Sequence, residues 1–348
     1  MRLLTSNPAM NTRPSGRCAG YVVALLTAAL FVLPASPVEA ASAPGRAPVA
    51  KKKRKYTTFI DATTRRRIRY HKLEAPELRK TFRYMVYLPK GGIKPGKKYP
   101  LLVLLHGLGE YPHGWITLGR IHREIDRLVA AGRMPAPILL LASGRNGYWT
   151  NWADGRHPYG DLVVRRYMTD IRSRYPIAER ADHVAIAGCS MGGFGALSLG
   201  LQYPELFSFV VALSPTDMEI ALEVSPKRKL YRNIVGQRRS RLSVQRINPR
   251  HLVLRGYGSP QQRFLMIYGA REGRKFGEGT ERVAHAMRLR GLQVEVMRVE
   301  REGHGWRNAW SRSHPWWISA LAEEWTRAGK KVHAADSTPR RRPAQARF

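Results

Sequence analysis

The stretch AIAGCSMGGFGAL, residues 185–197, places one serine between two glycines directly after a short apolar run. Gly188, Ser190 and Gly192 fit the pattern G-x-S-x-G, in which a serine lies on a sharp turn between a strand and a helix. The residues before the motif, HVAIAG, predict a buried strand, and those after it, MGGFGALSLGLQ, predict a helix. This context predicts that Ser190 is held out as a nucleophile. The alternative is an ordinary glycine-rich turn.

Short apolar runs alternate with helical patterns on both sides of this motif. Strands are predicted at residues 66–73, 81–89, 99–107, 137–143, 183–188, 207–215, 263–269 and 293–299. Helices are predicted at residues 118–132, 161–175, 191–202, 279–291 and 315–325, the last of them opened by Pro315. Residues 217–262 break this alternation and are expected to form an excursion or lid over the site.

The pattern within the strands indicates how they pair. The first two alternate between polar and apolar residues, as antiparallel strands do, whereas the later ones are nearly continuous apolar runs, as parallel strands covered by helices are. The sequence therefore predicts an α/β fold with a mostly parallel, doubly wound sheet, helices on both faces and an antiparallel N-terminal start.

A serine nucleophile in such a fold needs an acid and a histidine that follow it in the chain. His304 lies in a glycine-flanked loop after the last strand and is the predicted general base, with His314 as its competitor. Glu272 follows the strand at 263–269 and is the predicted acid that orients the imidazole. Glu278 is a rival for that role, and a surface salt bridge with neighbouring arginines is the alternative for Glu272.

Two backbone amides are expected to stabilise the oxyanion. Met191 directly follows the nucleophile, and Leu108 lies in the loop after the strand at 99–107, so their N–H groups are the predicted donors. His106 in the same loop is expected to be structural. The sequence contains no HExxH motif or Cys/His cluster, and this mechanism needs neither a metal nor a cofactor.

The chain resembles the esterase D family of α/β-hydrolases, which includes feruloyl and acetylxylan esterases, S-formylglutathione hydrolases and mycolyltransferases. The resemblance covers roughly residues 67–318 and rests on YMVYLP, YPLLVLLHGLG with Trp115 after it, GYWTNW, IAGCSMGGFGAL with YPELF behind it, YGAREG and GHGWRNAW. It implies an α/β-hydrolase fold, the triad Ser190, Glu272 and His304, and oxyanion donors at Leu108 and Met191. The family often has aspartate in the acid position. The glutamate found here resembles the mycolyltransferase branch of the family, in which glutamate also occurs.

Four aromatic residues are candidates for binding a sugar ring or an aromatic acyl group: Tyr148, Trp149, Trp152 and Trp306. They lie in segments expected near the carboxyl ends of the strands. The alternative is that these rings are packed within the fold.

The N-terminus has the pattern of a secretory signal. Arg2, Arg13 and Arg17 precede the apolar run CAGYVVALLTAALFVLP, and small residues up to Ala40 form a cleavage site. The expected organisation is a signal peptide at 1–40, an Ala/Pro-rich linker with a basic run at 41–55, a catalytic domain at 56–328 and a basic disordered tail at 329–348. The protein is therefore expected to be secreted, periplasmic or in the cell envelope, with no membrane span after cleavage. A retained anchor is the alternative.

The charge of the chain is strongly positive. Sixty Lys and Arg residues against 25 Asp and Glu give a formal net charge of +35, which suggests anionic surroundings such as an envelope polymer bound through the basic tails. An ordinary solvated surface is the alternative. The run KKKRK resembles a nuclear localisation signal, but it follows a secretory signal, so no nucleic-acid partner is expected.

These observations predict a secreted serine carboxylic-ester hydrolase that forms an acyl-enzyme on Ser190 and acts on a small or polysaccharide-linked ester. Acyl transfer to an alcohol uses the same residues and is one alternative. A cell-envelope binding protein with vestigial catalysis is the other.

Overall fold

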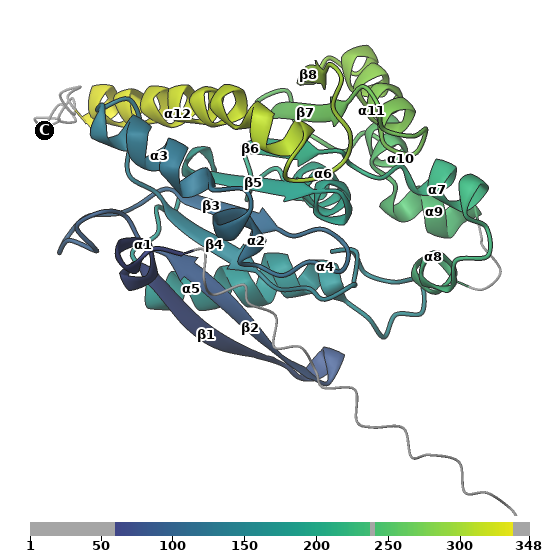
Figure 1. The fold of residues 1–348 in the computed structure, drawn as a ribbon, viewed down its shortest axis with the longest axis horizontal. Coiled ribbons are helices and arrows are strands. Elements are labelled where there is room, and N and C mark those ends of the chain that lie inside the picture. Colours follow the sequence, from purple (N-terminus) through teal and green to yellow (C-terminus); the bar gives the residue numbers. More distant parts are fainter. Residues whose placement is uncertain (1–59, 237–240, 337–348) are drawn as a thin grey trace, which may run out of the picture. The chain divides into compact units, whose positions relative to one another are not determined.

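The computed structural model describes residues 60–236 and 241–336. The predicted signal peptide, the linker with its basic run and the end of the chain after residue 336 lie outside these residues. The described part contains a sheet of eight strands in the order β1-β2-β4-β3-β5-β6-β7-β8 (Figure 1).

Each of the eight predicted strands is present. Their bounds are β1 (Ile68–Ala75), β2 (Lys80–Tyr87), β3 (Leu101–Leu105), β4 (Ile138–Ala142), β5 (Val184–Cys189), β6 (Phe209–Leu213), β7 (Arg263–Gly269) and β8 (Gln293–Val299). β1 pairs antiparallel with β2, and β2 pairs antiparallel with β4. The remaining neighbours are parallel. The prediction of a mostly parallel sheet with an antiparallel start is confirmed.

The helices cover more of the chain than was predicted. The α-helices are α1 (Ala62–Arg66), α2 (Gly114–Thr117), α3 (Ile121–Ala130), α4 (Tyr159–Asp161), α5 (Met168–Arg174), α6 (Met191–Gln202), α7 (Met218–Val224), α8 (Lys229–Val235), α9 (Arg241–Ile247), α10 (Pro249–Leu254), α11 (Gly277–Leu289) and α12 (Ala309–Asp336). Two 3₁₀ turns, η2 (Pro76–Leu78) and η4 (Ala181–His183), precede β2 and β5. The helix predicted at 161–175 is present, with a π-helical stretch, η3 (Leu162–Tyr167), between α4 and α5.

Apolar side chains pack on both faces of the sheet. Strand β3 shows why: Leu102 and Leu104 belong to the core that includes α3 and α12, whereas Leu101, Val103 and Leu105 belong to the core that includes α6 and α11. A strand buried on both sides needs an unbroken apolar run, because successive side chains point to opposite faces. In Figure 1, α3 and α12 lie side by side over one face of the sheet.

The last helix differs from its prediction at both ends. It begins at Ala309 rather than at Pro315, which lies inside it, and it continues to Asp336, into the segment expected to be a tail. A proline inside a helix costs about 3 kcal/mol because it removes a backbone hydrogen bond. Here Trp310, His314 and Trp317 are all buried at helical spacing across the proline, and we attribute the continued helix to this packing.

The excursion at residues 217–262 forms helices α7 to α10. Asp217 caps α7 by accepting hydrogen bonds from the N–H groups of Glu219 and Ile220. α10 packs against α6 and α11, whereas the Ile234 carbonyl of α8 accepts from the N–H of Ala153 in the loop after β4. The excursion is therefore a group of short helices, and only part of it approaches the loops at the carboxyl ends of the strands.

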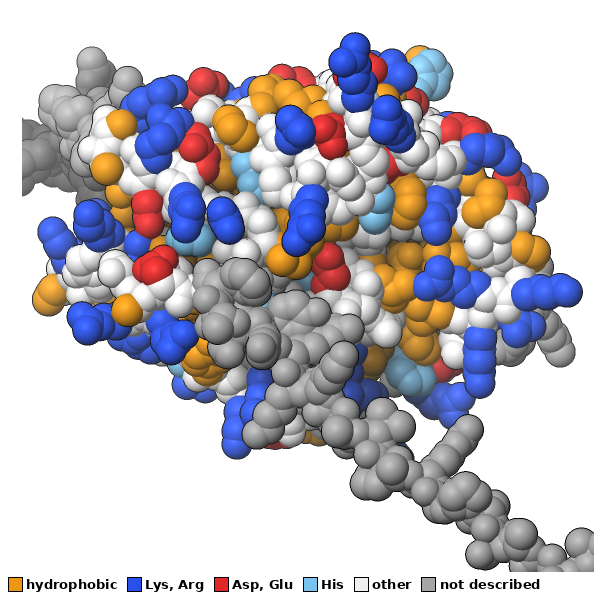
Figure 2. Space-filling view, in the orientation of Figure 1, with side chains coloured by type: hydrophobic (Ala, Val, Ile, Leu, Met, Phe, Trp, Pro, Cys, Tyr) orange, Lys and Arg blue, Asp and Glu red, His pale blue; other side chains and the backbone are white. Residues whose placement is uncertain are grey.

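None of the helices within residues 60–236 and 241–336 is both long and apolar enough to cross a membrane. On the face drawn in Figure 2, Lys and Arg side chains are spread among other residues rather than gathered into one patch.

Candidate active site

Ser190 lies on the turn between β5 and α6, as the motif predicted. Its backbone has φ 55° and ψ −114°, a conformation that costs a non-glycine residue of order 1–3 kcal/mol. Close packing explains the flanking glycines: a Cβ on Gly192 would lie 2.1 Å from the carbonyl oxygen of Leu105. The Ser190 N–H donates to the carbonyl of Leu213 in β6 at 2.7 Å, which fixes the turn to the neighbouring strand. The strand, the turn and the helix are confirmed, and Ser190 is partly exposed.

Glu272 and His304 lie together at the same edge of the sheet. Glu272 follows β7 and His304 follows β8, and these two strands are parallel neighbours. The Glu272 side chain is fully buried, and its Oε2 lies 3.6 Å from Nδ1 of His304, just beyond hydrogen-bond distance. Within the described part of the chain this Oε2 has no hydrogen-bond partner, so the imidazole N–H is the donor that it faces. Its burial excludes the interpretation of Glu272 as a surface salt-bridge residue.

The His304 ring is held by two aromatic residues. It stacks on Phe276 with ring centroids 4.1 Å apart and meets the edge of Trp310 at 4.8 Å. One third of the His304 side chain is exposed, so one side of the ring remains accessible to a substrate.

The two rivals take other positions. Glu278 lies in the first turn of α11 and pairs with Arg274 at 2.7 Å, away from any histidine partner in the described residues. His314 is buried inside α12, between Trp306 and Trp317. Burial lowers the pKa of His314 to about 4, which makes it a poor base at neutral pH.

Ser214 is a site residue that the sequence analysis missed. Its hydroxyl donates to Oε1 of Glu272 at 2.6 Å and accepts from Nε1 of Trp310 at 2.7 Å. It follows β6, so the ends of β5, β6, β7 and β8 each contribute one residue to this edge. Its φ of 49° is unusual for serine, and its N–H donates to Ile267 of β7. The sequence placed Ser214 inside the strand predicted at 207–215, and only the fold shows that β6 ends before it and that Glu272 lies beside it.

The two predicted oxyanion donors, Leu108 and Met191, have N–H groups without a hydrogen-bond acceptor among the described residues. Met191 is the first residue of α6, where a helix leaves its N–H groups without backbone acceptors. In the loop after β3, the N–H of Gly107 donates to Glu110 and that of Gly109 donates to Asn146, both at 3.0 Å. Among the described residues, the Leu108 N–H between them has no acceptor. This arrangement leaves the predicted pair of donors, Leu108 and Met191, available.

The contact between nucleophile and base is not formed in this structure. Within residues 60–236 and 241–336, no hydrogen bond joins the hydroxyl of Ser190 to the imidazole of His304. Catalytic hydrogen bonds are often long in the free enzyme and tighten when substrate binds. The structure thus brings Glu272 and His304 together and leaves the Ser190–His304 contact as a prediction.

Three of the four predicted substrate-binding aromatics are packing residues. Tyr148, Trp149 and Trp306 are 2 %, 0 % and 7 % exposed, and each makes an edge-to-face contact with a neighbouring ring. Trp149 donates from Nε1 to the carbonyl of His106. Stacking of these three on a substrate is not supported, because they are buried; Gly144 and Gly119 leave the space that the rings of Trp149 and Trp306 occupy.

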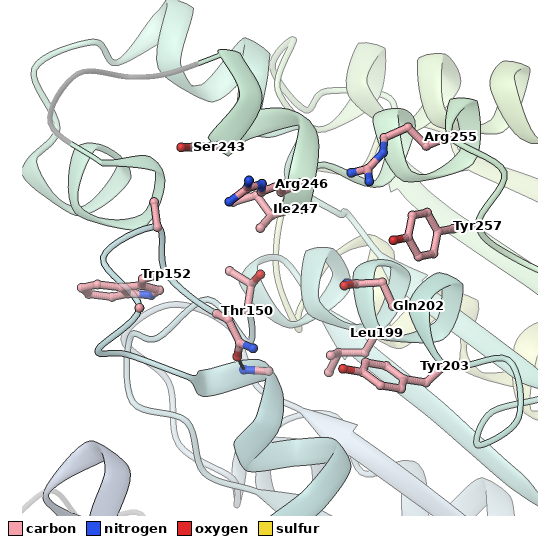
Figure 3. A pocket seen from close by; sticks show the side chains of 14 residues that line it. Thr150, Trp152, Leu199, Gln202, Tyr203, Ser243, Arg246, Ile247, Arg255 and Tyr257 are labelled. Atoms are coloured by element: carbon pink, nitrogen blue, oxygen red, sulfur yellow. Dashed lines mark hydrogen bonds between the residues drawn. The ribbon is translucent and has the colours of Figure 1, made fainter.

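Trp152 lines two cavities, one of about 740 Å³ and one of about 390 Å³. The larger cavity reaches the oxyanion loop at Gly109, Glu110 and Tyr111, and Tyr111 is a half-exposed ring that the sequence analysis missed. Figure 3 shows the smaller cavity, with Trp152 on one side and Gln202, Tyr203 and Tyr257 on the other. The larger cavity is lined by Gly109, the residue after Leu108, so it is the better of the two candidates for substrate.

Comparisons with known proteins agree with this architecture. The chain is 31% identical over 130 residues to an acetyl esterase of Caldicellulosiruptor saccharolyticus, covering 35% of this chain and 46% of that protein. It is 29% identical over 136 residues to an endo-1,4-beta-xylanase/feruloyl esterase of Xylanibacter ruminicola, covering 37% of this chain and 19% of that protein. The matched stretches thus span less than half of either relative.

Solved structures show the same fold. A ferulic acid esterase superimposes with a TM-score of 0.61 at 21% identity, covering 74% of this chain and 98% of that one. An S-formylglutathione hydrolase from Agrobacterium tumefaciens gives a TM-score of 0.59 at 18% identity, covering 74% and 94%. The α/β-hydrolase fold is therefore confirmed.

One family model, described as "Putative esterase", matches residues 75–344, which is most of the chain. The protein belongs to this esterase family.

Proposed function

We propose that this protein is a secreted serine carboxylic-ester hydrolase that works through an acyl-enzyme on Ser190. The observation that carries the proposal is the buried Glu272 carboxylate facing Nδ1 of His304, at the edge of the sheet where the strained turn presents Ser190. Membership of the esterase family supports the reaction class.

The proposed reaction follows from the roles of these groups. The Ser190 hydroxyl attacks the ester carbonyl while Nε2 of His304 takes its proton, and the amides of Leu108 and Met191 stabilise the resulting oxyanion. The tetrahedral intermediate collapses, and His304 returns the proton to the departing alcohol. Water then attacks the acyl-enzyme by the same steps and releases the acid. Glu272 holds the imidazole with its proton on Nδ1 and stabilises the imidazolium.

The proposed substrate and location follow from the names of two relatives and from the N-terminal sequence. The names of two relatives, an acetyl esterase and a feruloyl esterase, favour acetyl or feruloyl esters of a polysaccharide. The secretory pattern at residues 1–40 supports export, and those residues lie outside the described part of the chain.

A fluorophosphonate probe and a panel of chromogenic esters test the proposed function. Purified protein is expected to hydrolyse some of the acetyl, longer acyl and feruloyl esters, and to be labelled covalently by the probe at Ser190. The Ser190→Ala variant serves as the blank and is expected to show neither activity nor label. Unlabelled wild-type protein without esterase activity would favour the binding-protein alternative, and faster product formation with an added alcohol acceptor would favour acyl transfer.

The role of the acid is tested by the same substitution at two glutamates. Glu272→Gln is expected to lower kcat about 10³- to 10⁴-fold, because an amide N–H facing Nδ1 stabilises the wrong imidazole tautomer. Glu278→Gln, at the exposed rival that pairs with Arg274, is expected to leave kcat unchanged. Steady-state rates on p-nitrophenyl acetate and thermal unfolding of both variants make the measurement. Equal losses in the two variants would contradict the assignment of Glu272.

A further inference from the structure

The carboxylate of Glu110 connects two loops of the candidate site. It lies in the loop after β3, where Oε2 accepts a hydrogen bond from the N–H of Gly107 at 3.0 Å. Its other oxygen, Oε1, accepts from Nε1 of Trp306 at 2.8 Å. Gly107 directly precedes the oxyanion donor Leu108, and Trp306 lies two residues after His304. One side chain thus links the oxyanion loop with the histidine loop.

The Trp306 ring is seated in the segment that follows the oxyanion loop. It meets Trp115 at 4.9 Å and Trp310 at 5.1 Å between ring centroids, in both cases edge to face. A Cβ on Gly119 would lie only 2.7 Å from this ring, so the close approach requires glycine there. These ring contacts fix the orientation of the Trp306 ring, and the hydrogen bond to Glu110 fixes the position of its Nε1.

A third contact connects Glu110 to the nucleophile turn. The thiol of Cys189, the residue before Ser190, lies 3.5 Å from Oε2 of Glu110. Burial, followed by the charge of Glu110, raises the pKa of this thiol, so Cys189 stays protonated and can donate to the carboxylate. Glu110 therefore contacts the residue before the oxyanion donor, the residue before the nucleophile and a residue two positions after the base.

We propose that Glu110 is a positioning residue. Its hydrogen bond with Gly107 fixes the position of the Leu108 amide, and its hydrogen bond with Trp306 holds the histidine loop in register with that amide. The inference rests on the proposed function, since it assigns Glu110 a role in the same site. Asn146 completes the arrangement by accepting from Gly109, so that both neighbours of the Leu108 amide are bound and only the middle amide is free.

A positioning role for Glu110 affects kcat and inhibitor affinity in a way that a purely structural role would not. The oxyanion is absent from the bound ester and forms only when Ser190 attacks, so a displaced Leu108 amide lowers kcat and leaves KM nearly unchanged. An inhibitor that forms an oxyanion on Ser190, such as an aryl trifluoromethyl ketone, loses affinity in parallel with kcat. A loss of packing alone would lower the melting temperature without weakening this inhibitor selectively.

The experiment compares Glu110→Gln and Trp306→Phe with wild-type protein on one chromogenic ester. Glu110→Gln is expected to lower kcat on the order of 10- to 100-fold, with KM within about twofold and a matching rise in the Ki of the trifluoromethyl ketone. Trp306→Phe removes the same hydrogen bond from the other side, so the double variant is expected to lose less than the product of the two single losses. Glu110→Asp is expected to recover part of the activity.

The matched control is Glu77→Gln, at a carboxylate that accepts two hydrogen bonds from Arg166 near the far edge of the sheet. It is expected to change neither kcat nor the inhibitor constant. If the wild-type protein is active, the proposed function stands. The inference is then overturned if kcat of Glu110→Gln is unchanged, or if its kcat/KM falls only because KM rises. If Glu110→Gln does not fold, Trp306→Phe decides by the same two readouts. An inactive wild-type protein removes the proposed function instead.

Discussion

Replacing His304 with alanine is expected to lower kcat for ester hydrolysis about 10⁵- to 10⁶-fold, and adding Ser190→Ala is expected to lower it no further. The two groups act as one unit, because a serine hydroxyl without its base is a weak nucleophile and a base without the hydroxyl has no proton to take. The residual rate comes from the oxyanion amides and from substrate binding, which both variants keep.

Steady-state rates of the two single variants and the double variant check this expectation, and circular dichroism confirms that each is folded. His285→Ala, on the exposed face of α11, is the matched control and is expected to keep full activity. His314→Ala distinguishes the rival base: it is expected to cost stability, since the ring is buried, and to leave kcat of the folded fraction nearly unchanged. If the loss of kcat in the double variant equals the product of the two single losses, Ser190 and His304 do not work together. The missing hydrogen bond between them would then be a property of the working enzyme.

The sequence was sufficient for the sheet and for the order of the catalytic candidates. Each β-strand is a short run of residues whose apolar or alternating pattern can be recognised locally, and these patterns identify all eight strands. The G-x-S-x-G turn requires glycine at fixed positions, because a Cβ at Gly192 would overlap the backbone of β3. Ser190, Glu272 and His304 could be proposed because each follows a strand, and parallel strands end at one edge.

Features set by contacts between distant segments could not be predicted. Ser214 and Glu110 are ordinary polar residues in the sequence, and their roles depend on Glu272 and Trp306 lying beside them in the fold. The same reason explains the aromatic residues: burial of Trp149 and Trp306 depends on segments far along the chain. Helix α12 passes through Pro315 because tertiary packing outweighs a local helix-breaking signal.

Lowering the pH from 7.5 to 4.5 is expected to destabilise the folded protein strongly, because three histidines are buried in their neutral form. His106, His122 and His314 are 1 %, 6 % and 5 % exposed. Burial lowers the pKa of each to about 4, whereas an exposed histidine titrates near 6.5. His106 also uses both ring nitrogens in the neutral form: Nε2 accepts from the N–H of Gly144, so Nδ1 donates to the carbonyl of Gly107.

The direction of the effect follows from proton linkage. Between pH 6.5 and 4 the unfolded chain binds protons at these histidines and the folded protein does not, so the free energy of unfolding falls as the pH falls through this range. Each fully buried histidine contributes roughly 3 kcal/mol to the loss, and three together approach the total stability of a typical domain. Two carboxylates add their losses at lower pH. Burial raises the pKa of Asp170, but hydrogen bonds from Arg174 and Tyr84 outweigh it and lower the pKa, and hydrogen bonds from Thr64 lower the pKa of Asp61.

Urea unfolding at a series of pH values measures this dependence. With up to three protons taken up on unfolding, the slope of the unfolding free energy is expected to approach 4 kcal/mol per pH unit near pH 5.5. His314→Gln is expected to reduce this slope by about a third, whatever it does to stability at pH 7.5, because one buried proton acceptor is removed. His285→Gln, at an exposed position, is expected to leave the slope as in the wild type. A free energy of unfolding that stays level between pH 7.5 and 5 would mean that the three rings are solvated or charged in the folded protein. Their burial against Trp149, Tyr87 and Trp317 argues for the steep curve.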